Sequence, residues 1–342
     1  MKMAGATHKI LLILFLTFLT SKTYSNDNFL FTKNNNYSAK LTYKFDPKIG
    51  FFAEVQGFIR LILYCLQYNI LFNLDSSDFL YSINKGWEDY FEQFYDEDIH
   101  LEPNRKTYNC IHSDKIFFPI AQLYNFNDID IPNLGLYKNK IYENRRVIAQ
   151  KIYRYNSKIK ELIDKKIKKL NLPPNYSSLH IRRGDKESEA KPYHARKYLE
   201  MLLENDEKNK TIYICTDSYN AIEECHEYIK DRNLNIKILT SCKNKYRGYD
   251  QKKITKKQSD KKYIFKEFIR LLVDVEIASK SNYFIGTTTS AFSQFICLIH
   301  KNSENCFCLE RNCSMPKGIN DQYSEHYIYQ QGRFKKLYED KK

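Results

Sequence analysis

The most informative segment of the chain reads Ser178-Leu179-His180-Ile181-Arg182-Arg183-Gly184-Asp185-Lys186. Its first four residues favour a buried strand, and the glycine after the two arginines marks a turn. A guanidinium group can bind two phosphate oxygens at once, so adjacent arginines at a strand end suit a diphosphate. An isolated arginine pair is more often a salt-bridged surface feature, so the interpretation depends on the neighbouring segments.

Strands and helices alternate after this segment. The pattern predicts strands at Ser178–Ile181, Thr211–Cys215, Ile236–Leu239 and Tyr283–Ile285, and helices at Tyr198–Leu203, Ala221–Lys230, Phe265–Ala278 and from Phe292 onward. Such alternation is typical of a parallel sheet covered by helices on both faces. Ligands of these sheets bind at the carboxyl ends of the strands.

Polar residues occur where those strands end. Besides the arginine pair, they are Thr216-Asp217-Ser218, Asp274 on the helix before the last strand, and Thr287-Thr288-Thr289-Ser290 after it. The hydroxyl groups and the start of the following helix both offer donors to an anion. We therefore expect these residues to meet at one edge of the sheet and form a phosphate site.

The N-terminal half predicts a second α/β unit. Gly50 is expected to adopt a positive φ and turn the chain into a helix beginning near Ala53, followed by a strand at Ile70–Leu74. Apolar residues then recur every three or four positions from Ile148 to Leu170, which predicts one amphipathic helix. It is stopped by Pro173 and Pro174, where we place the domain boundary. The predicted domains are residues 26–172 and 173–342.

Length and composition agree with two globular domains. The chain has 342 residues, of which 42% are hydrophobic and 15% aromatic, and no repeat is evident. Its formal charge of +14 comes mostly from dispersed lysines. A nucleic-acid partner is not expected, because residues 1–25 resemble a secretory leader.

That leader combines Lys2 and Lys9 with the apolar run Ile10–Leu19. The run is short for a membrane span, which needs about 20 apolar residues, so a cleaved signal peptide is favoured over a signal anchor. Either would direct the chain to the lumen of the endoplasmic reticulum or Golgi, for secretion or membrane association. Possible glycosylation acceptors are Asn36, Asn175, Asn209 and Asn312, and six of the nine cysteines lie in polar segments where disulfides could form: Cys110, Cys225, Cys242, Cys306, Cys308 and Cys313. Cys65 and Cys297 lie in apolar runs and are expected to be buried.

The order and spacing of these motifs resemble the α-1,6-fucosyltransferases, with partial similarity to chitin-oligosaccharide and protein O-fucosyltransferases. The resemblance covers most of residues 175–300: the His180–Lys186 signature with Glu189 and Tyr198, then Thr216-Asp217-Ser218, Asp274 and Thr289-Ser290. It implies an α/β fold of the GT-B type, with two Rossmann-like lobes built on parallel sheets. It also implies an inverting enzyme that transfers L-fucose from GDP-fucose to a glycan or glycoprotein without a metal or other cofactor.

The resemblance also assigns roles by position. Arg182 would stabilise the departing GDP, Glu189 would be the general base, and Lys186 would position the base or the sugar. The substrate-binding residues would be His180, Arg183, Asp185, Tyr198, Asp217, Asp274, Thr289 and Ser290. Glu187 competes with Glu189, because the spacing after Asp185 is one residue shorter than in the vertebrate enzymes that fucosylate the N-glycan core.

Other interpretations remain open from the sequence. The fold could use a different nucleotide sugar, or it could bind glycans without turnover. The acidic pairs Asp96/Asp98 and Asp128/Asp130 resemble the metal-binding motif of GT-A enzymes, although neither clearly follows a core strand. No cysteine or histidine spacing predicts a metal site.

Overall fold

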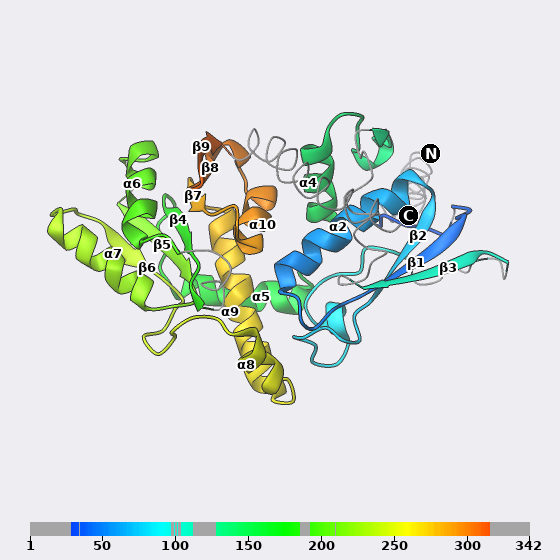
Figure 1. Cartoon of the computed structure of the whole chain (residues 1–342), viewed down its shortest axis with the longest axis horizontal. Coiled ribbons are helices and arrows are strands. Elements are labelled where there is room, and N and C mark those ends of the chain that lie inside the picture. The colour runs from blue at the N-terminus through cyan, green and yellow to red at the C-terminus, as the bar shows by residue number, and fades with distance from the viewer. Residues whose placement is uncertain are drawn as a thin grey trace, which may run out of the picture.

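The computed structural model describes residues 29–33, 35–96, 99, 101, 104–111, 128–184, 192–208 and 210–314. Within this part of the chain, two separate sheets lie on either side of a group of central helices (Figure 1). We call the described residues before 173 the N-terminal lobe and those from 173 onward the C-terminal lobe. The predicted boundary itself stays a prediction.

The N-terminal lobe is built on a three-stranded parallel sheet. Its strands β1 (Ala39–Lys44), β2 (Ile70–Asp75) and β3 (Lys106–Ile111) have the order β2-β1-β3. Along β1 the residues alternate between buried and half-buried, as expected for a strand with one face on a core. A short 3-10 helix, η1 (Gly86–Asp89), buries the single tryptophan, Trp87.

Helix α2 (Phe51–Gln67) lies between this sheet and the C-terminal lobe (Figure 1). Twelve of its seventeen residues are buried, so it is covered on nearly every side. Gly50 precedes the helix as its N-cap with φ −67° and ψ 141°. The expected positive φ at this glycine is wrong, because the chain enters the helix from an extended conformation that any residue can adopt.

The predicted single helix from Ile148 to Leu170 is also wrong. The structure has two helices there, α4 (Ile141–Ile152) and α5 (Ser157–Lys168). Between them the chain extends and pairs with a neighbouring segment, since the Glu92 amide donates to the Arg154 carbonyl and the Asn156 amide donates to the Tyr90 carbonyl. The Asn156 side chain then caps α5. These contacts replace the helical hydrogen bonds that a continuous helix would have made.

The C-terminal lobe contains a six-stranded sheet of order β6-β5-β4-β7-β8-β9. All neighbouring strands are parallel except β9, which is antiparallel to β8. The strands are β4 (Ser177–Ile181), β5 (Thr211–Thr216), β6 (Lys237–Leu239), β7 (Phe284–Gly286), β8 (Cys306–Cys308) and β9 (Arg311–Ser314). The helices of this lobe are α6 (Ala195–Asn205), α7 (Asn220–Asp231), α8 (Gln251–Lys256), α9 (Lys261–Ser279), α10 (Ala291–Ile299) and the short 3-10 helix η5 (Ser303–Asn305). A further 3-10 helix, η3 (Pro132–Leu134), belongs to the N-terminal lobe. Every strand and helix predicted for this lobe is present, with ends shifted by a few residues.

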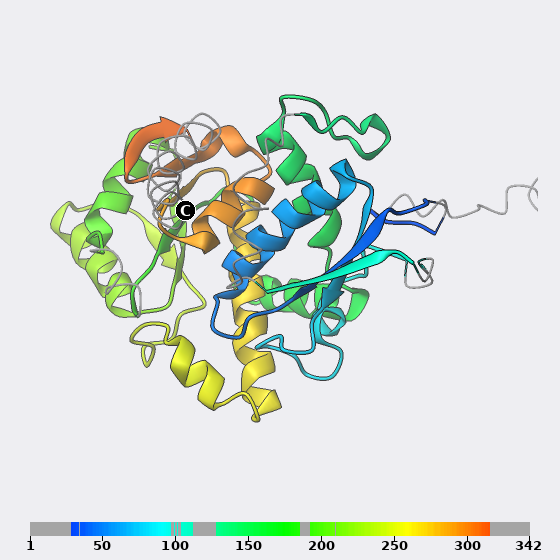
Figure 2. The ribbon, with the colours of Figure 1, turned by 45° about the vertical axis from the view of Figure 1, so that its right-hand side comes forward.

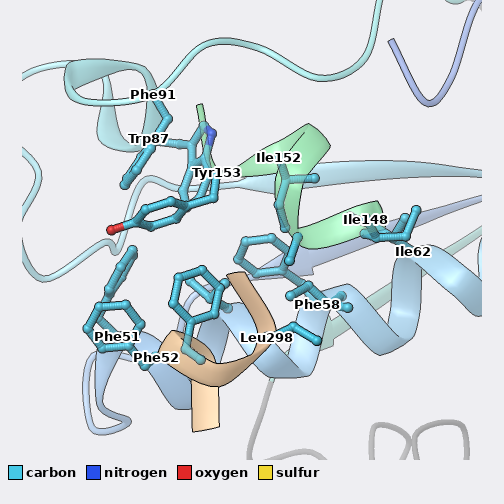
Figure 3. Packing of buried hydrophobic residues seen from close by; sticks show 14 of the residues in the cluster. Phe51, Phe52, Phe58, Ile62, Trp87, Phe91, Ile148, Ile152, Tyr153 and Leu298 are labelled. Atoms are coloured by element: carbon cyan, nitrogen blue, oxygen red, sulfur yellow. The ribbon is translucent and has the colours of Figure 1, made fainter. Parts of the chain in front are cut away.

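Aromatic side chains join the two lobes. Helices α2, α9 and α10 lie side by side at the centre of the molecule (Figure 2). The ring centroids of Phe51 and Phe268 are 4.9 Å apart, and Phe52 lies 5.0 Å from Phe292 and 5.1 Å from Phe295. Figure 3 shows Phe51 and Phe52 within the same cluster as Trp87 and Tyr153. One hydrophobic core therefore spans both lobes, and a second lies within the C-terminal lobe.

The cysteines that the structure describes are buried. Cys225, Cys242 and Cys306, expected in polar segments where disulfides could form, are unbridged core residues. Cys65 and Cys297 are buried, as predicted. The leader and Cys313 lie outside the residues whose side chains are described. Among the described residues, none of the helices has the length and apolar character needed to cross a membrane.

Glu54 is a buried carboxyl group at the start of α2, and it predicts a pH-dependent stability. It accepts hydrogen bonds from the Tyr43 hydroxyl and the Asp46 amide, and burial raises its pKa to about 8. The folded protein therefore binds more protons than the unfolded chain between about pH 4.5 and 8, so this group's stabilising contribution is lost as the pH rises through that range.

We expect Glu54→Gln to be more stable relative to the native protein at pH 9 than at pH 5, by roughly 4 kcal/mol, since one pKa unit corresponds to about 1.4 kcal/mol. Urea unfolding of both proteins at the two pH values measures this difference. A stability difference that does not change with pH would contradict the assignment.

Candidate active site

A cavity of about 470 Å³ lies between the lobes, at the carboxyl ends of β4, β5 and β7. Both lobes line it. The N-terminal lobe contributes Lys48, Gly50, Phe51, Phe52, Ala53 and Tyr81, and the C-terminal lobe contributes His180, Arg182, Cys215, Thr216, Asp217, Tyr249, Gln251, Arg270, Leu271, Asp274, Thr289, Ser290, Ala291, Phe292 and Gln294. Most of the polar residues predicted from the strand ends are therefore brought together.

Arg182 enters the cavity directly after β4 and is held from two sides. Its Nη1 atom forms an ion pair with Asp217, which follows β5, and its guanidinium carbon lies 5.0 Å from the centre of the Tyr249 ring. The side chain remains 18% exposed. Because an ion pair and a cation–π contact both restrict the guanidinium, Arg182 is positioned before any ligand arrives.

Asp217 also organises the backbone around Arg182. Its Oδ1 accepts a hydrogen bond from the Arg183 amide and its Oδ2 accepts one from the Tyr249 amide, both at 2.9 Å. A carboxylate that accepts several hydrogen bonds at once is strongly fixed. The same residue thus aligns the arginine and the loop that carries the stacking tyrosine.

Two glycines allow these segments to cross. Gly184 has φ +73° and Gly248 has φ +110°. A Cβ atom on Gly184 would lie 2.4 Å from the Tyr249 carbonyl oxygen, and one on Gly248 would lie 2.5 Å from the Gly184 Cα. Only glycine fits both the conformation and the space. The turn expected at Gly184 is confirmed.

The expectation that both guanidinium groups face one diphosphate requires a correction. Arg183 does not line the cavity: its Nη2 donates to both carboxylate oxygens of Glu224 on α7, at 3.2 and 3.0 Å, and its Nη1 donates to the Tyr193 carbonyl. Successive residues of an extended chain point in opposite directions, so one arginine faces the cavity and the other faces α7.

His180 borders the cavity at the end of β4. Its Nδ1 lies 2.7 Å from the Ser293 Oγ, and its ring lies 4.4 Å from that of Phe292. Burial, and secondarily the charge of Arg182, lower the pKa of His180 to about 3. The imidazole is therefore neutral near pH 7 and serves as a hydrogen-bonding group in the wall.

Asp274 lies on α9 and lines the cavity. Its Oδ1 accepts hydrogen bonds from the Tyr213 hydroxyl and the Ser241 hydroxyl, both at 2.6 Å. Burial raises the pKa of Asp274 despite the opposing charge of Arg270 and those two bonds. Both bonds use Oδ1, and no residue in the described part of the chain donates a hydrogen bond to Oδ2.

The turn before α10 supplies hydroxyl groups and the helix start. Ser290 is the N-cap, and its Oγ accepts from the Ser293 amide. Thr289 and the Thr288 amide contact the carboxylate of Glu310. An anion in the cavity would meet the positive end of α10 here.

Several sequence-based candidates lie elsewhere. Tyr198, expected to contact substrate, is 1% exposed and packs in the core beneath α6, because it sits on the face of α6 that covers the sheet. Asp185, Lys186, Glu187 and Glu189 lie outside the described residues, so their roles stay predictions. Asp96, Asp128 and Asp130 do not line the cavity, and Asp128 pairs with Lys138.

Sequence reasoning missed Tyr249 and Arg270. Tyr249 comes from a loop with no regular pattern, and its hydroxyl reaches Tyr81 of the other lobe at 3.1 Å. Arg270 precedes Asp274 by four residues on α9, so a search of that helix face for partners of Asp274 would have found it.

The comparisons with known proteins establish the fold. No family model and no curated protein matches this sequence. The structure of an Arabidopsis thaliana FUT1 variant in complex with GDP is similar over 77% of this chain and 68% of that one, with 8% identity and a TM-score of 0.50. The chain has a GT-B-type fold. The predicted fold class is thereby confirmed.

Two further solved structures are similar at lower TM-scores. The fucosyltransferase NodZ from Bradyrhizobium shares 14% identity over 76% of this chain and 93% of its own, with a TM-score of 0.45. POFUT1 in complex with GDP shares 11% identity over 80% of this chain and 98% of its own, with a TM-score of 0.44. In this chain Arg182 lies in the cavity between the two lobes.

Proposed function

We propose that this protein is an inverting glycosyltransferase that transfers L-fucose from GDP-fucose to a glycan or glycoprotein acceptor. The observation that carries the proposal is Arg182, a restrained guanidinium at the carboxyl end of β4 that faces a cavity between two lobes. A diphosphate leaving group develops negative charge as its bond to the sugar breaks, and a fixed cation at that point is the main requirement for catalysis.

The donor is assigned from the site together with the similar structures. NodZ has been soaked with GDP-fucose, and POFUT1 and FUT1 structures contain GDP. In this chain His180, Asp274, Thr289 and Ser290 border the cavity beside Arg182. We assign the diphosphate to Arg182 and the start of α10, and the nucleoside to the walls formed by His180 and Asp274.

The acceptor hydroxyl would attack the anomeric carbon of fucose from the face opposite the diphosphate. A new carbon–oxygen bond forms, the bond to GDP breaks, and the hydroxyl proton passes to a general base, for which Glu189 is our candidate and Glu187 the alternative. Lys186 and Asp185 belong to the same loop and are proposed to position the reactants. We propose that no metal is required, because Arg182 supplies the positive charge at the leaving group.

The secretory lumen is the proposed location, where the acceptors would be glycans or glycoproteins. It rests on the leader-like residues 1–25. Of the potential glycosylation sites, Asn36 and Asn175 are exposed and so accessible to modification. Membrane association through the N-terminal segment belongs to the same proposal.

The test is a transfer assay with the purified chain in the presence of EDTA. The donors are GDP-fucose, GDP-mannose and UDP-sugars, and the acceptors are chitin oligomers, N-glycans and folded glycoprotein domains. We expect acceptor-dependent release of GDP from GDP-fucose alone. Transfer from a UDP-sugar would assign a different donor, and nucleotide binding without transfer to any acceptor would indicate a non-catalytic glycan-binding protein.

A further inference from the structure

Arg270 lines the cavity together with the cationic side chains of Lys48 and Arg182, and none of the features above explains it. It lies on α9 one turn before Asp274, and its guanidinium stacks on Tyr246 with 4.5 Å between the guanidinium carbon and the ring centre. Glu267 accepts from its Nη2 at 3.3 Å and also accepts from the Tyr246 hydroxyl at 2.7 Å. The guanidinium is thus held in one orientation.

The hydrogen-bond donors of Arg270 are only partly used. Nη2 is paired with Glu267, and Nε is buried without a partner. Among the described residues none accepts from Nη1, and this atom is not one of the buried unpaired ones, so it is accessible to solvent on a residue that lines the cavity. A charged donor held next to a cavity is suited to an acceptor atom of a ligand.

Asp274 and Arg270 form a complementary pair of hydrogen-bonding groups. Residues four apart on a helix lie on the same face, about 5–6 Å apart at their Cβ atoms. Asp274 offers the acceptor Oδ2 and Arg270 offers the donor Nη1. The Watson–Crick edge of guanine has the matching order, a carbonyl acceptor at C6 beside donors at N1 and N2, whereas adenine has a donor at C6 and an acceptor at N1.

We propose that Arg270 binds the C6 carbonyl oxygen of the donor's nucleobase, and that with Asp274 it selects a 6-oxopurine. The inference rests on the proposed function, because it requires a nucleoside diphosphate sugar in this cavity. It assigns to Arg270 a part in choosing the base, separate from the charge stabilisation assigned to Arg182.

The experiment measures binding of two diphosphates by calorimetry: GDP, and the diphosphate of 2-aminopurine riboside, which lacks the C6 oxygen. The variants are Arg270→Gln, Arg270→Lys and, as a matched control, Lys266→Gln, an exposed cation one turn earlier on α9 that does not line the cavity. We expect Arg270→Gln to weaken GDP binding by roughly 10- to 100-fold and to leave the 2-aminopurine ligand nearly unchanged. The GDP affinity of Arg270→Lys should lie between those of the native protein and Arg270→Gln, because lysine keeps the charge and loses the planar geometry.

The outcomes separate this inference from the proposed function. If the native protein prefers GDP to ADP and UDP but Arg270→Gln keeps that preference, the inference fails and the function stands. Equal weakening of both diphosphates would place Arg270 at the phosphates and would also overturn it. If the native protein shows no preference for GDP, the proposed donor is wrong. Thermal melting of each variant without ligand checks that the fold is intact.

Discussion

Arg182→Ala is expected to lower turnover of GDP-fucose by at least about 100- to 1000-fold, the range found when one fixed donor to a developing negative charge is removed. The loss should appear in kcat more than in KM, because the interaction is strongest when the diphosphate departs. Folding should survive, since Asp217 keeps its hydrogen bonds from the Arg183 and Tyr249 amides. Arg182→Lys should recover only part of the rate.

Release of GDP and thermal melting, measured on the same preparations, test this expectation. The matched control is Arg196→Ala, which removes an arginine on α6 that is 57% exposed and pairs with Glu200. The control should match the native protein in both measurements. Full activity in Arg182→Ala would remove this residue from the mechanism.

Gly184→Ala is the substitution with the largest expected effect on stability. Its φ of +73° costs an L-residue roughly 1–2 kcal/mol, and the new Cβ would lie 2.4 Å from the Tyr249 carbonyl oxygen. The backbone of one of the two crossing segments must move, so we expect a total loss of about 3 kcal/mol or more. Because Arg182 and Tyr249 sit on those segments, the affinity for GDP should fall as well.

Gly50→Ala provides the comparison for Gly184→Ala. Nothing lies within 4 Å of a Cβ built on Gly50, and its φ is −67°. Its stability should therefore stay within about 0.5 kcal/mol of the native value. Chemical denaturation measures the free energy of unfolding of both variants. Similar values for the two would show that the segments crossing at Gly184 can move apart without loss of stability.

The C-terminal lobe could be predicted because its central strands are buried along their whole length and alternate with amphipathic helices. Strands β1 and β3 were missed for different reasons. In β1, lysines and a threonine alternate with the apolar residues over only six positions. In β3 the first four residues are exposed, so neither strand gives a strong apolar signal. The break between α4 and α5 was hidden because Ile152, Tyr155 and Ile159 keep helical spacing across it, and only pairing with residues 90–92 reveals it.

The site was predictable where chain order determines position. Arg182, Asp217 and Ser290 follow parallel strands, so they had to share an edge of the sheet. The direction of Arg183 depends on Glu224, which lies on a different helix, and the burial of Tyr198 depends on how α6 packs. The role of Arg270 becomes apparent only from its contacts with Glu267 and Tyr246, and that of Tyr249 only from its contact with Arg182. No local sequence pattern indicates these contacts.

The phenylalanines shared by α2, α9 and α10 limit how this molecule can open. Swinging the halves apart about a hinge would hydrate Phe51, Phe52 and the rings that they touch, at a cost of roughly 1.5–3 kcal/mol for each side chain fully exposed. A wide clamshell motion is therefore disfavoured. A ligand would then enter and leave through small rearrangements at the mouth of the cavity, while the aromatic contacts hold the two lobes together.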